Sequence, residues 1–343
     1  MKALVKTAPG PGNLELKDVP DPLPGPGQVL VRMRAIGVCG TDVHIMHGSY
    51  RTSTPVIIGH EFAGDIVAVG EGVTQWRPGD RVVAENIEGA CGICELCRTG
   101  NPHICANKRA YGTDSNGTMA ELAVFTAAAV HRLPVEVGYE EAAVLEPLAV
   151  VNRGVVERGM VRPENTVVVI GPGSIGLLAV QVCRAAGCRE IVLAGTDRDE
   201  AVRLPIGRTC GATRVVNAQR EDLRAVVAAV TQGRGADLVV EAAGTPRSVQ
   251  EAFHLAGRGK VIAAIGLTGR EFPLDWDVGV FKEIDVRFSK SSTYLSWDRA
   301  ISMVAGRRVD VRPLITHRFP LQRWQEALDV SASGAAIKAL LIP

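Results

Sequence analysis

The chain has 343 residues, of which 46% are hydrophobic and 22% charged, and its 38 basic and 37 acidic side chains leave a formal net charge of +1. This length allows two domains with separate cores, while the near-neutral charge argues against a nucleic-acid or acidic-membrane partner and favours a small substrate. The N-terminus lacks the apolar core of a signal peptide, and no apolar run reaches the ~20 residues of a membrane span. We therefore expect a cytoplasmic protein whose eight cysteines serve metals or packing.

Residues 1–130 predict an irregular, mostly antiparallel β domain. They are rich in glycine and proline and contain short β-type runs at 28–35, 64–69 and 81–84. Two fragments of this region, VCGTDVH and IGHEFAG, contain Cys39, His60 and Glu61. Cysteine, histidine and carboxylate groups are suitable zinc ligands, and a set with fewer than four firm ligands leaves room for water or substrate.

Four cysteines follow in one short loop, residues 91–105. The segment CGICELCRTGNPHIC contains Cys91, Cys94, Cys97 and Cys105 in the spacing C-x2-C-x2-C-x7-C. Two intervening residues let the chain turn back and present successive sulfurs to one ion, so the loop predicts a closed tetrahedral zinc site with a structural role. The alternatives are buried free thiols or a pair of disulfides.

From residue 139 the composition changes. Residues 139–158 are predicted to be helical, with an interruption at Pro147. Strands are then expected at 166–170, 191–194, 237–241 and 260–265, and helices at 175–186 and 222–231. This alternation predicts a parallel, doubly wound sheet. A last apolar strand is expected at 339–342.

The segment TVVVIGPGSIG contains a dinucleotide-binding pattern. Gly171, Gly173 and Gly176 follow a predicted strand directly and, with Ser174 and Ile175, open a helix. The glycines permit a tight turn and close approach of the backbone to a pyrophosphate, and the first amides of the helix point at the phosphates. The alternative is a structural glycine-rich turn.

The next strand is expected to end in a residue that selects the cofactor. About 20 residues beyond the glycines the sequence has Gly195 and Thr196, followed by Asp197 and Arg198. A carboxylate from Asp197 favours NAD by binding the ribose diol, whereas Gly195 with Thr196 and Arg198 can accommodate the 2′-phosphate of NADP. The pattern favours NAD only slightly.

Together these motifs resemble the zinc-dependent medium-chain alcohol and polyol dehydrogenases, most closely the branch that contains sorbitol and threonine dehydrogenases. The resemblance extends over nearly the whole chain, with the motifs in the same order. It implies an α/β fold in which a GroES-like β domain, residues 1–148 and 288–343, carries the zinc loop, and a Rossmann domain, residues 149–287, binds the dinucleotide. It also implies a cleft between the domains and assembly as a homodimer or homotetramer.

The resemblance implies a catalytic zinc in addition to the structural one. Cys39 and His60 correspond to firm ligands in the family. The third protein ligand stays open between Glu61, which follows the histidine, and Glu146 in LEPLA, and the two carboxylates can exchange during turnover. The alternative for Glu146 is a carboxylate at a helix break.

Three further residues correspond to positions that serve the family's proton transfer. Asp42 would orient the ring of His60, as zinc-bound histidines generally require, although it could instead cap a turn. Thr41 would accept the substrate proton, and His44 would pass it towards solvent, a role that suits histidine because the side chain of this residue type generally has a pKa near neutrality. The alternative for His44 is an ordinary surface histidine.

The predicted reaction is hydride transfer between NAD or NADP and a secondary alcohol. With 7 Phe, 4 Trp and 4 Tyr in the chain, an aromatic slot for large hydrophobic alcohols lacks support, so a polyol, sugar, cyclitol or vicinal diol is favoured. A threonine or simple secondary-alcohol dehydrogenase is the alternative, although the stretch IMHGSY lacks the tryptophans associated with threonine dehydrogenases. Other classes are a non-enzymatic zinc-loop binding protein, which would not need the glycine motif, and a zinc-free reductase, which would lack both metal sites.

Overall fold

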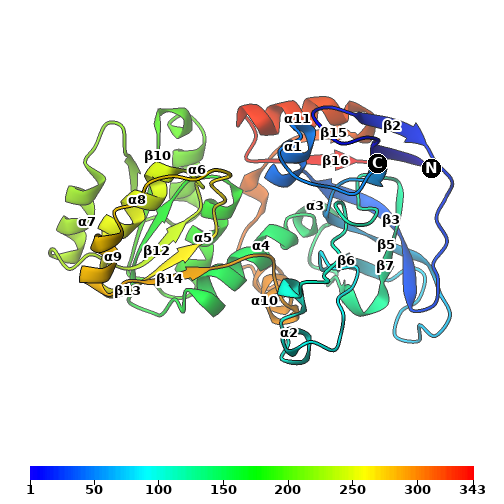
Figure 1. The fold of residues 1–343 in the computed structure, drawn as a ribbon, viewed down its shortest axis with the longest axis horizontal. Coiled ribbons are helices and arrows are strands. Elements are labelled where there is room, and N and C mark those ends of the chain that lie inside the picture. The colour runs from blue at the N-terminus through cyan, green and yellow to red at the C-terminus, as the bar shows by residue number, and fades with distance from the viewer. The chain divides into compact units, whose positions relative to one another are not determined.

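The computed structural model describes all 343 residues, which form two compact units. Unit 1 comprises Met1–Ala149, Ser291–Ala305 and Ile315–Pro343, and unit 2 comprises Val150–Lys290 and Gly306–Leu314. Figure 1 colours the chain by residue number, so unit 1 is blue to green with additions in orange and red. Neither unit is a continuous segment, because the chain passes from one to the other at residues 149/150, 290/291, 305/306 and 314/315.

Unit 1 is built on β-sheet. A seven-stranded sheet has the order β15-β16-β3-β5-β6-β8, with β7 paired to β3, and a smaller sheet has the order β2-β1-β4. The strands of the unit are β1 (Lys2–Lys6), β2 (Leu14–Asp18), β3 (Gln28–Gly37), β4 (Val56–Ile57), β5 (Glu61–Val69), β6 (Arg81–Ala84), β7 (Leu122–Thr126), β8 (Val130–Arg132), β15 (Ile315–Pro320) and β16 (Lys338–Ile342). The helices are α1 (Gly40–Met46), α2 (Glu95–Arg98), α3 (Tyr139–Ala142), α4 (Leu145–Val151, which continues into unit 2), α10 (Tyr294–Ala305) and α11 (Trp324–Ser333).

Strand β3 lies at the centre of this sheet and brings distant parts of the chain together. It pairs antiparallel with β5, so that Gly37 stands opposite Glu61, and also with β16, where Leu340 stands opposite Gly37. Its buried apolar side chains join a core in which Phe62 and Phe125 stack with their ring centroids 4.4 Å apart. The ends of β3, β5 and β16 are therefore fixed next to one another by the core beneath them.

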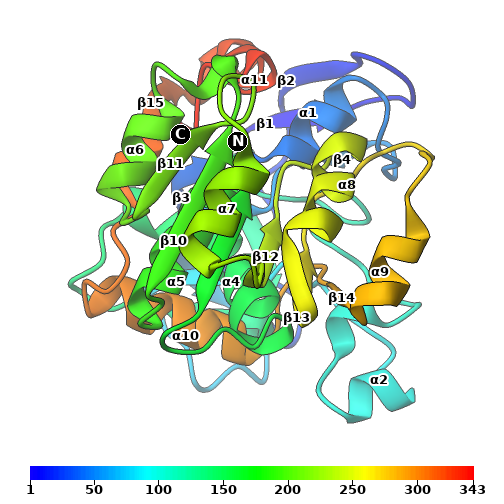
Figure 2. The ribbon, with the colours of Figure 1, turned by 90° about the vertical axis from the view of Figure 1, so that its left-hand side faces the viewer.

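Unit 2 is a doubly wound parallel sheet, as the alternation of elements predicts. Its six strands have the order β11-β10-β9-β12-β13-β14 and all pair in parallel. Helices α5 and α6 pack together and against the sheet, and α7 and α8 form a second such pair (Figure 2). The elements are β9 (Thr166–Ile170), α5 (Ser174–Ala185), β10 (Glu190–Gly195), α6 (Arg203–Thr209), β11 (Arg214–Asn217), α7 (Leu223–Thr231), β12 (Ala236–Glu241), α8 (Pro246–Leu255), β13 (Ala256–Ala264), α9 (Trp276–Lys282) and β14 (Asp285–Phe288).

The helical stretch 139–158 differs from its prediction. Pro147 does not interrupt it, because this proline is the third residue of α4, where a backbone N–H would have no partner inside the helix. The break lies earlier, between α3 and α4, and the stretch ends in a π-helical segment, Asn152–Arg158. Pro205 likewise lies in the first turn of α6, which starts at Arg203 and is only seven residues long.

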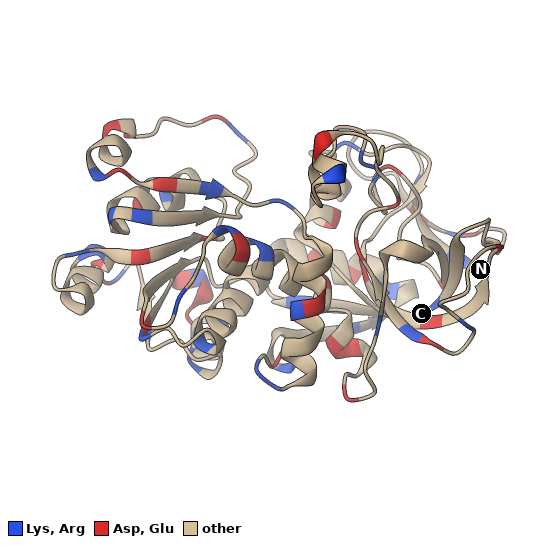
Figure 3. Cartoon of the chain, turned by 90° about the horizontal axis from the view of Figure 1, so that it is seen from below, with Lys and Arg blue, Asp and Glu red and all other residues tan.

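The short segment Gly306–Leu314 is held in unit 2 by a buried glutamine. Gln181 of α5 donates to the carbonyl oxygen of Asp310 at 2.8 Å and accepts from the backbone N–H of Asp310 at 2.7 Å. Lys and Arg residues and Asp and Glu residues are dispersed over both units (Figure 3). No helix of the structure is both long enough and apolar enough to cross a membrane.

Candidate functional site

Three candidate zinc ligands lie close together in unit 1. Cys39 immediately precedes α1, His60 immediately precedes β5, and Glu61 is the first residue of β5. The sulfur of Cys39, a ring nitrogen of His60 and a carboxylate oxygen of Glu61 lie within 4.8 Å of one another. His60 and Glu61 are buried and Cys39 is half-buried. One thiolate, one imidazole and one carboxylate make a donor set that fits zinc and leaves a fourth position open.

The charges around His60 also fit a cation. Burial alone would lower the pKa of His60, but the neighbouring Cys39, Asp42 and Glu146 raise it well above its usual value. The surroundings of the ring therefore favour a positive charge at this position.

The fourth candidate zinc ligand, Glu146, is not a member of this close group. It lies in the first turn of α4 and is buried. Burial raises the pKa of its carboxyl, while the charges of His60 and Lys338 act in the opposite direction. Glu146 is thus near enough to interact electrostatically with the group, but its oxygens are farther from it than those of Glu61.

Asp42 and Thr41 occupy the first turn of α1. The carboxylate of Asp42 accepts from the backbone N–H of Cys39 at 2.8 Å and so caps the helix. Its other oxygen, Oδ1, is buried and has no hydrogen-bond partner, including His60. The thiol of Cys39 lies 3.7 Å from the hydroxyl of Thr41. The Thr41 hydroxyl is therefore next to the candidate metal group, and Asp42 fixes the backbone that carries Cys39.

His44 lies one helical turn further along α1 and is exposed. Its Nδ1 is 3.1 Å from the hydroxyl of Ser49, which in turn donates to the carbonyl oxygen of His44 at 3.2 Å. The ring is thus fixed by a local contact and is open to water, as a group that exchanges protons with solvent needs to be.

Lys338 is a neighbour of the group that our sequence reasoning missed. It is the first residue of β16, its side chain is 3% exposed, and its ammonium group donates to both carboxylate oxygens of Glu61 at 2.8 and 2.7 Å. A single lysine in the apolar stretch AIKALLIP is the signal that could have identified it, since a buried cation is rare without a buried partner.

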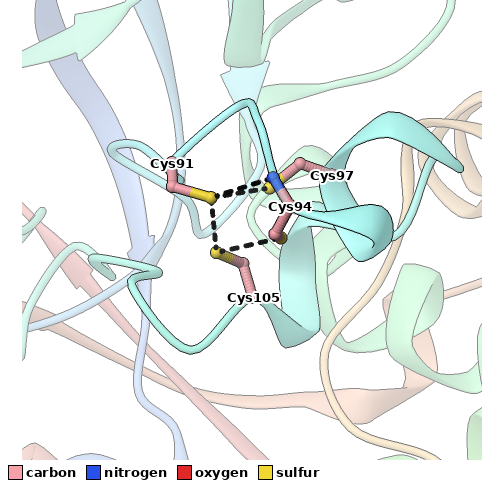
Figure 4. A group of neighbouring side chains, drawn as sticks. All are labelled: Cys91, Cys94, Cys97 and Cys105. Atoms are coloured by element: carbon pink, nitrogen blue, oxygen red, sulfur yellow. Dashed lines mark hydrogen bonds between the residues drawn. The ribbon is translucent and has the colours of Figure 1, made fainter.

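The four cysteines of the loop 91–105 form a second group. Figure 4 shows their sulfurs turned towards one another. Three of the separations are 3.9 Å for Cys91 and Cys97, 3.8 Å for Cys94 and Cys105, and 3.6 Å for Cys105 and Cys91. Sulfurs that surround one zinc tetrahedrally at about 2.3 Å stand about 3.8 Å apart. The loop therefore has the donors and the size for a closed four-thiolate site.

Backbone groups tune these thiols differently. The N–H of Cys94 donates to the sulfur of Cys91, and such backbone bonds lower the pKa of Cys91 to about 6. Burial and the neighbouring thiols raise the pKa of Cys97 to about 12. Gly92 and Gly100 adopt φ values of +71° and +79°, which the tight turns of the loop require.

The glycine motif of unit 2 lies between β9 and α5, with Ser174 and Ile175 in the first turn of the helix. Gly171 has a φ of +100°, and a Cβ at this position would collide with Ala243. A Cβ at Gly176 would collide with the carbonyl oxygen of Gly171, whereas the space beside Gly173 is open. The motif thus combines a tight turn with an accessible helix N-terminus, which suits a pyrophosphate.

The turn after β10 holds its acidic residues in fixed positions. Asp197 accepts from Asn217 at 2.7 Å and pairs with Arg220 at 2.7 Å, so its carboxylate is bound to the end of β11 and to the loop that follows it. Thr196 donates to Asp199 through both its backbone N–H and its hydroxyl, each at 2.9 Å. Arg198 is exposed in the same turn.

Comparisons with known proteins agree over the whole chain. The family described as alcohol dehydrogenase GroES-like domain matches residues 25–135, and the family described as zinc-binding dehydrogenase matches residues 174–306. A sorbitol dehydrogenase from Halalkalibacterium halodurans is 35% identical over 100% of this chain and 99% of its own, and an L-threonine 3-dehydrogenase from Saccharopolyspora erythraea is 36% identical over 99% and 98%. The structure of a zinc-binding dehydrogenase from Sinorhizobium meliloti 1021 bound to NADP superposes with a TM-score of 0.90 at 31% identity, covering 100% of this chain and 99% of the other.

Proposed function

The chain belongs to the zinc-dependent medium-chain alcohol dehydrogenase family and is a polyol or alcohol dehydrogenase, and we propose that Cys39, His60 and Glu61 hold its catalytic zinc. The observation that carries this proposal is the close approach of three different donor types in a buried site, within 4.8 Å. Glu146 is the proposed alternative ligand, because it lies near enough to His60 to affect the pKa of that ring. The four-cysteine loop is proposed to hold the structural zinc.

The residues around this site have separate roles in the proposed reaction. A zinc ion, when bound, lowers the pKa of an alcohol oxygen and polarises a carbonyl. Thr41, whose hydroxyl lies beside Cys39, acts as a relay: it accepts the proton of the substrate hydroxyl and gives up its own proton towards His44. His44, which is exposed, delivers that proton to water. The carbon that loses the hydride becomes a carbonyl, and the hydride passes to C4 of the nicotinamide ring.

We propose a polyol, sugar, cyclitol or vicinal diol as the substrate. Tyr50 is 37% exposed, and partial burial together with the charges of Asp114 and Cys39 raises the pKa of its phenol. The phenol is therefore a neutral hydrogen-bond donor close to the metal group, which suits a second hydroxyl of the substrate. Trp297, by contrast, is buried in a stack with His131, so it supports the core and not a hydrophobic substrate slot. The similarity to a threonine dehydrogenase makes L-threonine the second candidate.

The enzyme binds a nicotinamide dinucleotide, and we propose that it accepts NADP at least as well as NAD. The support is the turn after β10, where Asn217 and Arg220 both contact Oδ1 of Asp197, and the charge of Arg220 offsets the repulsion that this carboxylate would exert on a 2′-phosphate. Gly195, the last residue of β10, lies beside Pro172 of the glycine motif. A glycine at this position has no carboxylate to repel a 2′-phosphate. This proposal differs from the slight preference for NAD that the sequence pattern suggested.

We also propose that the enzyme is a homo-oligomer. Strand β14 is an edge of the six-stranded sheet, and large apolar side chains near it are exposed, among them Phe281 and Phe288 at 74% each. An unpaired edge with apolar neighbours suits pairing with a second copy of the chain. Light scattering of the purified protein tests this, and a monomer at micromolar concentration would contradict it.

The experiment for the proposed function is hydride transfer, followed by nicotinamide absorbance. NAD and NADP are offered separately against polyols, vicinal diols, sugars and L-threonine, and metal content is measured on the same preparation. Two zinc ions per chain and reduction of NADP by a polyol are the expected results. Turnover restricted to L-threonine would replace the polyol proposal, turnover with NAD alone would contradict the NADP proposal, and a preparation that is active without zinc would contradict the metal site.

A further inference from the structure

The ion pair between Glu61 and Lys338 joins the candidate metal site to the last strand of the chain. The two side chains are 1% and 3% exposed, so water does not screen their charges. The ammonium group of Lys338 donates to Oε1 and Oε2 of Glu61 and, at 3.0 Å, to the carbonyl oxygen of Val38. An ammonium group has three donors, and all three are used here. The lysine therefore has one defined position.

Gly37 fixes the same carboxylate from the other side. In the pairing of β3 with β5 it stands opposite Glu61, and a Cβ at Gly37 would collide with Oε2 of Glu61. The carboxylate thus lies against bare backbone on one side and against an ammonium group on the other. Such a group cannot change its orientation without displacing Lys338.

This arrangement determines what Glu61 can offer a metal. Each carboxylate oxygen has two lone-pair sites, so an oxygen that accepts from Lys338 can still bind a zinc ion through its second site. The ammonium charge, however, draws negative charge from the carboxylate and repels a divalent ion nearby. Glu61 held in this way is a weaker zinc ligand than a free carboxylate.

We propose that Lys338 is a positioning residue that shares the Glu61 carboxylate with the catalytic zinc and thereby limits how tightly Glu61 binds the metal. This inference rests on the proposed function, because it assumes that Cys39, His60 and Glu61 surround the zinc. Its consequence is an exchangeable coordination shell, in which the carboxylate leaves room for a substrate oxygen. Without Lys338, Glu61 binds the zinc more tightly and leaves no position for a substrate oxygen.

The test compares Lys338→Met with Lys338→Arg, which keeps the charge, and with the double variant Glu61→Gln/Lys338→Met. The first readout is the rate at which the catalytic zinc passes to a chromophoric chelator. The second is the visible spectrum after cobalt replaces that zinc, since this spectrum reports the number and type of ligands. We expect Lys338→Met to release the metal roughly ten- to hundredfold more slowly and to show a changed cobalt spectrum. Losing a neighbour of a metal ligand commonly lowers affinity by this factor, but here the lost neighbour is a cation that repels the metal, so the sign is reversed.

Matched variants separate this effect from a general loss of structure. Lys338→Arg should release zinc at nearly the wild-type rate, and Lys338→Met should have no effect when Glu61 is already glutamine. Unchanged release and an unchanged spectrum in Lys338→Met overturn the inference, as does an equal slowing in the Glu61→Gln background.

Two further observations keep the test decisive. If Lys338→Met does not fold, a crystal structure of the zinc-loaded wild type decides, because the inference requires the Lys338 ammonium to remain in hydrogen-bond contact with Glu61. Separation of the two groups contradicts it. An enzyme that turns over normally without any zinc would contradict the proposed function instead, so the two failures are distinguishable.

Discussion

The four-cysteine loop and the group around Cys39 are both sets of side chains that could hold a metal ion, but the chain assembles them in different ways. The loop takes all its ligands from fifteen consecutive residues and orders them with two glycine turns and backbone N–H groups. The other group takes residues 39, 60 and 61 from the ends of sheet strands and balances them with a lysine from residue 338. A local site of thiolates alone is closed, whereas a site assembled across a sheet combines different donors and keeps a position for substrate.

Replacing a ligand of the second group should separate the two sites most strongly. Cys39→Ser or His60→Gln should lower kcat/KM by about ten-thousandfold, because the lost zinc supplies several kcal/mol of transition-state stabilisation. The loop should keep its own ion, so metal analysis should find one zinc per chain. Cys210→Ser, which changes a buried cysteine of unit 2, serves as the control and should keep activity and both ions. Near-normal turnover in the Cys39 or His60 variant would show that the catalytic metal lies elsewhere.

Replacing a ligand of the loop should give the opposite pattern. Cys97→Ser should lose the loop zinc and lower the free energy of unfolding by about 2.7 kcal/mol at a free zinc concentration a hundredfold above Kd, since bound metal stabilises only the folded state. Thermal unfolding with and without added zinc measures this difference. Activity per catalytic zinc should stay close to that of the wild type. A large loss of kcat with the stability unchanged would assign a catalytic role to the loop.

Asp42→Asn tests whether a residue next to the ligands affects zinc binding in the group around Cys39. Asp42 fixes the backbone of Cys39 and contributes to the raised pKa of His60, so we expect a loss of metal affinity or activity of roughly ten- to hundredfold. Asp80→Asn is the matched control, because Asp80 also accepts from a backbone N–H, that of Arg77, but is not a member of the metal group. Equal effects of the two variants on zinc affinity would indicate a general packing role for Asp42.

The smallest expected effect is the release of protons when zinc binds to the four-cysteine loop. Cys97, with its pKa raised to about 12, keeps its proton at neutral pH in the absence of metal, and zinc must displace that proton to bind. The affinity of the metal-free loop should therefore rise with pH between 6 and 8, about tenfold per unit for each proton released. A pH indicator in weak buffer measures the release directly. Zinc binding without proton release would contradict the raised pKa of Cys97.

Most of the fold could be predicted from local sequence signals. Strands β6 and β9 have the predicted bounds, because runs of β-branched residues bounded by turn signals depend little on the rest of the chain. The helical stretch 139–158 was less predictable, since helix breaks depend on tertiary packing as well as on proline. The GroES-like domain and the parallel sheet followed from the order of motifs, and the comparisons confirm them.

The candidate sites were likewise predictable only where their residues are close together in the sequence. The cysteine spacing and the glycine motif identified their residues because each motif is contiguous. Lys338 could not be found in that way, since its partner Glu61 lies 277 residues earlier and only the pairing of β3 with β5 and β16 brings them together. The orientation of Asp197 could not be predicted either, because it depends on Asn217 at the end of β11 and on Arg220 in the loop that follows.

The two hydrogen bonds between Gln181 and the backbone of Asp310 affect how the chain can be divided or recombined. A gene fragment that encodes only residues 150–290 would omit 306–314 and leave the amide of Gln181, which is 6% exposed, without its two backbone partners. An unsatisfied buried amide costs roughly 1–3 kcal/mol. The nucleotide-binding unit is therefore not a portable module, and a chimaeric enzyme should inherit the short return segment together with α5.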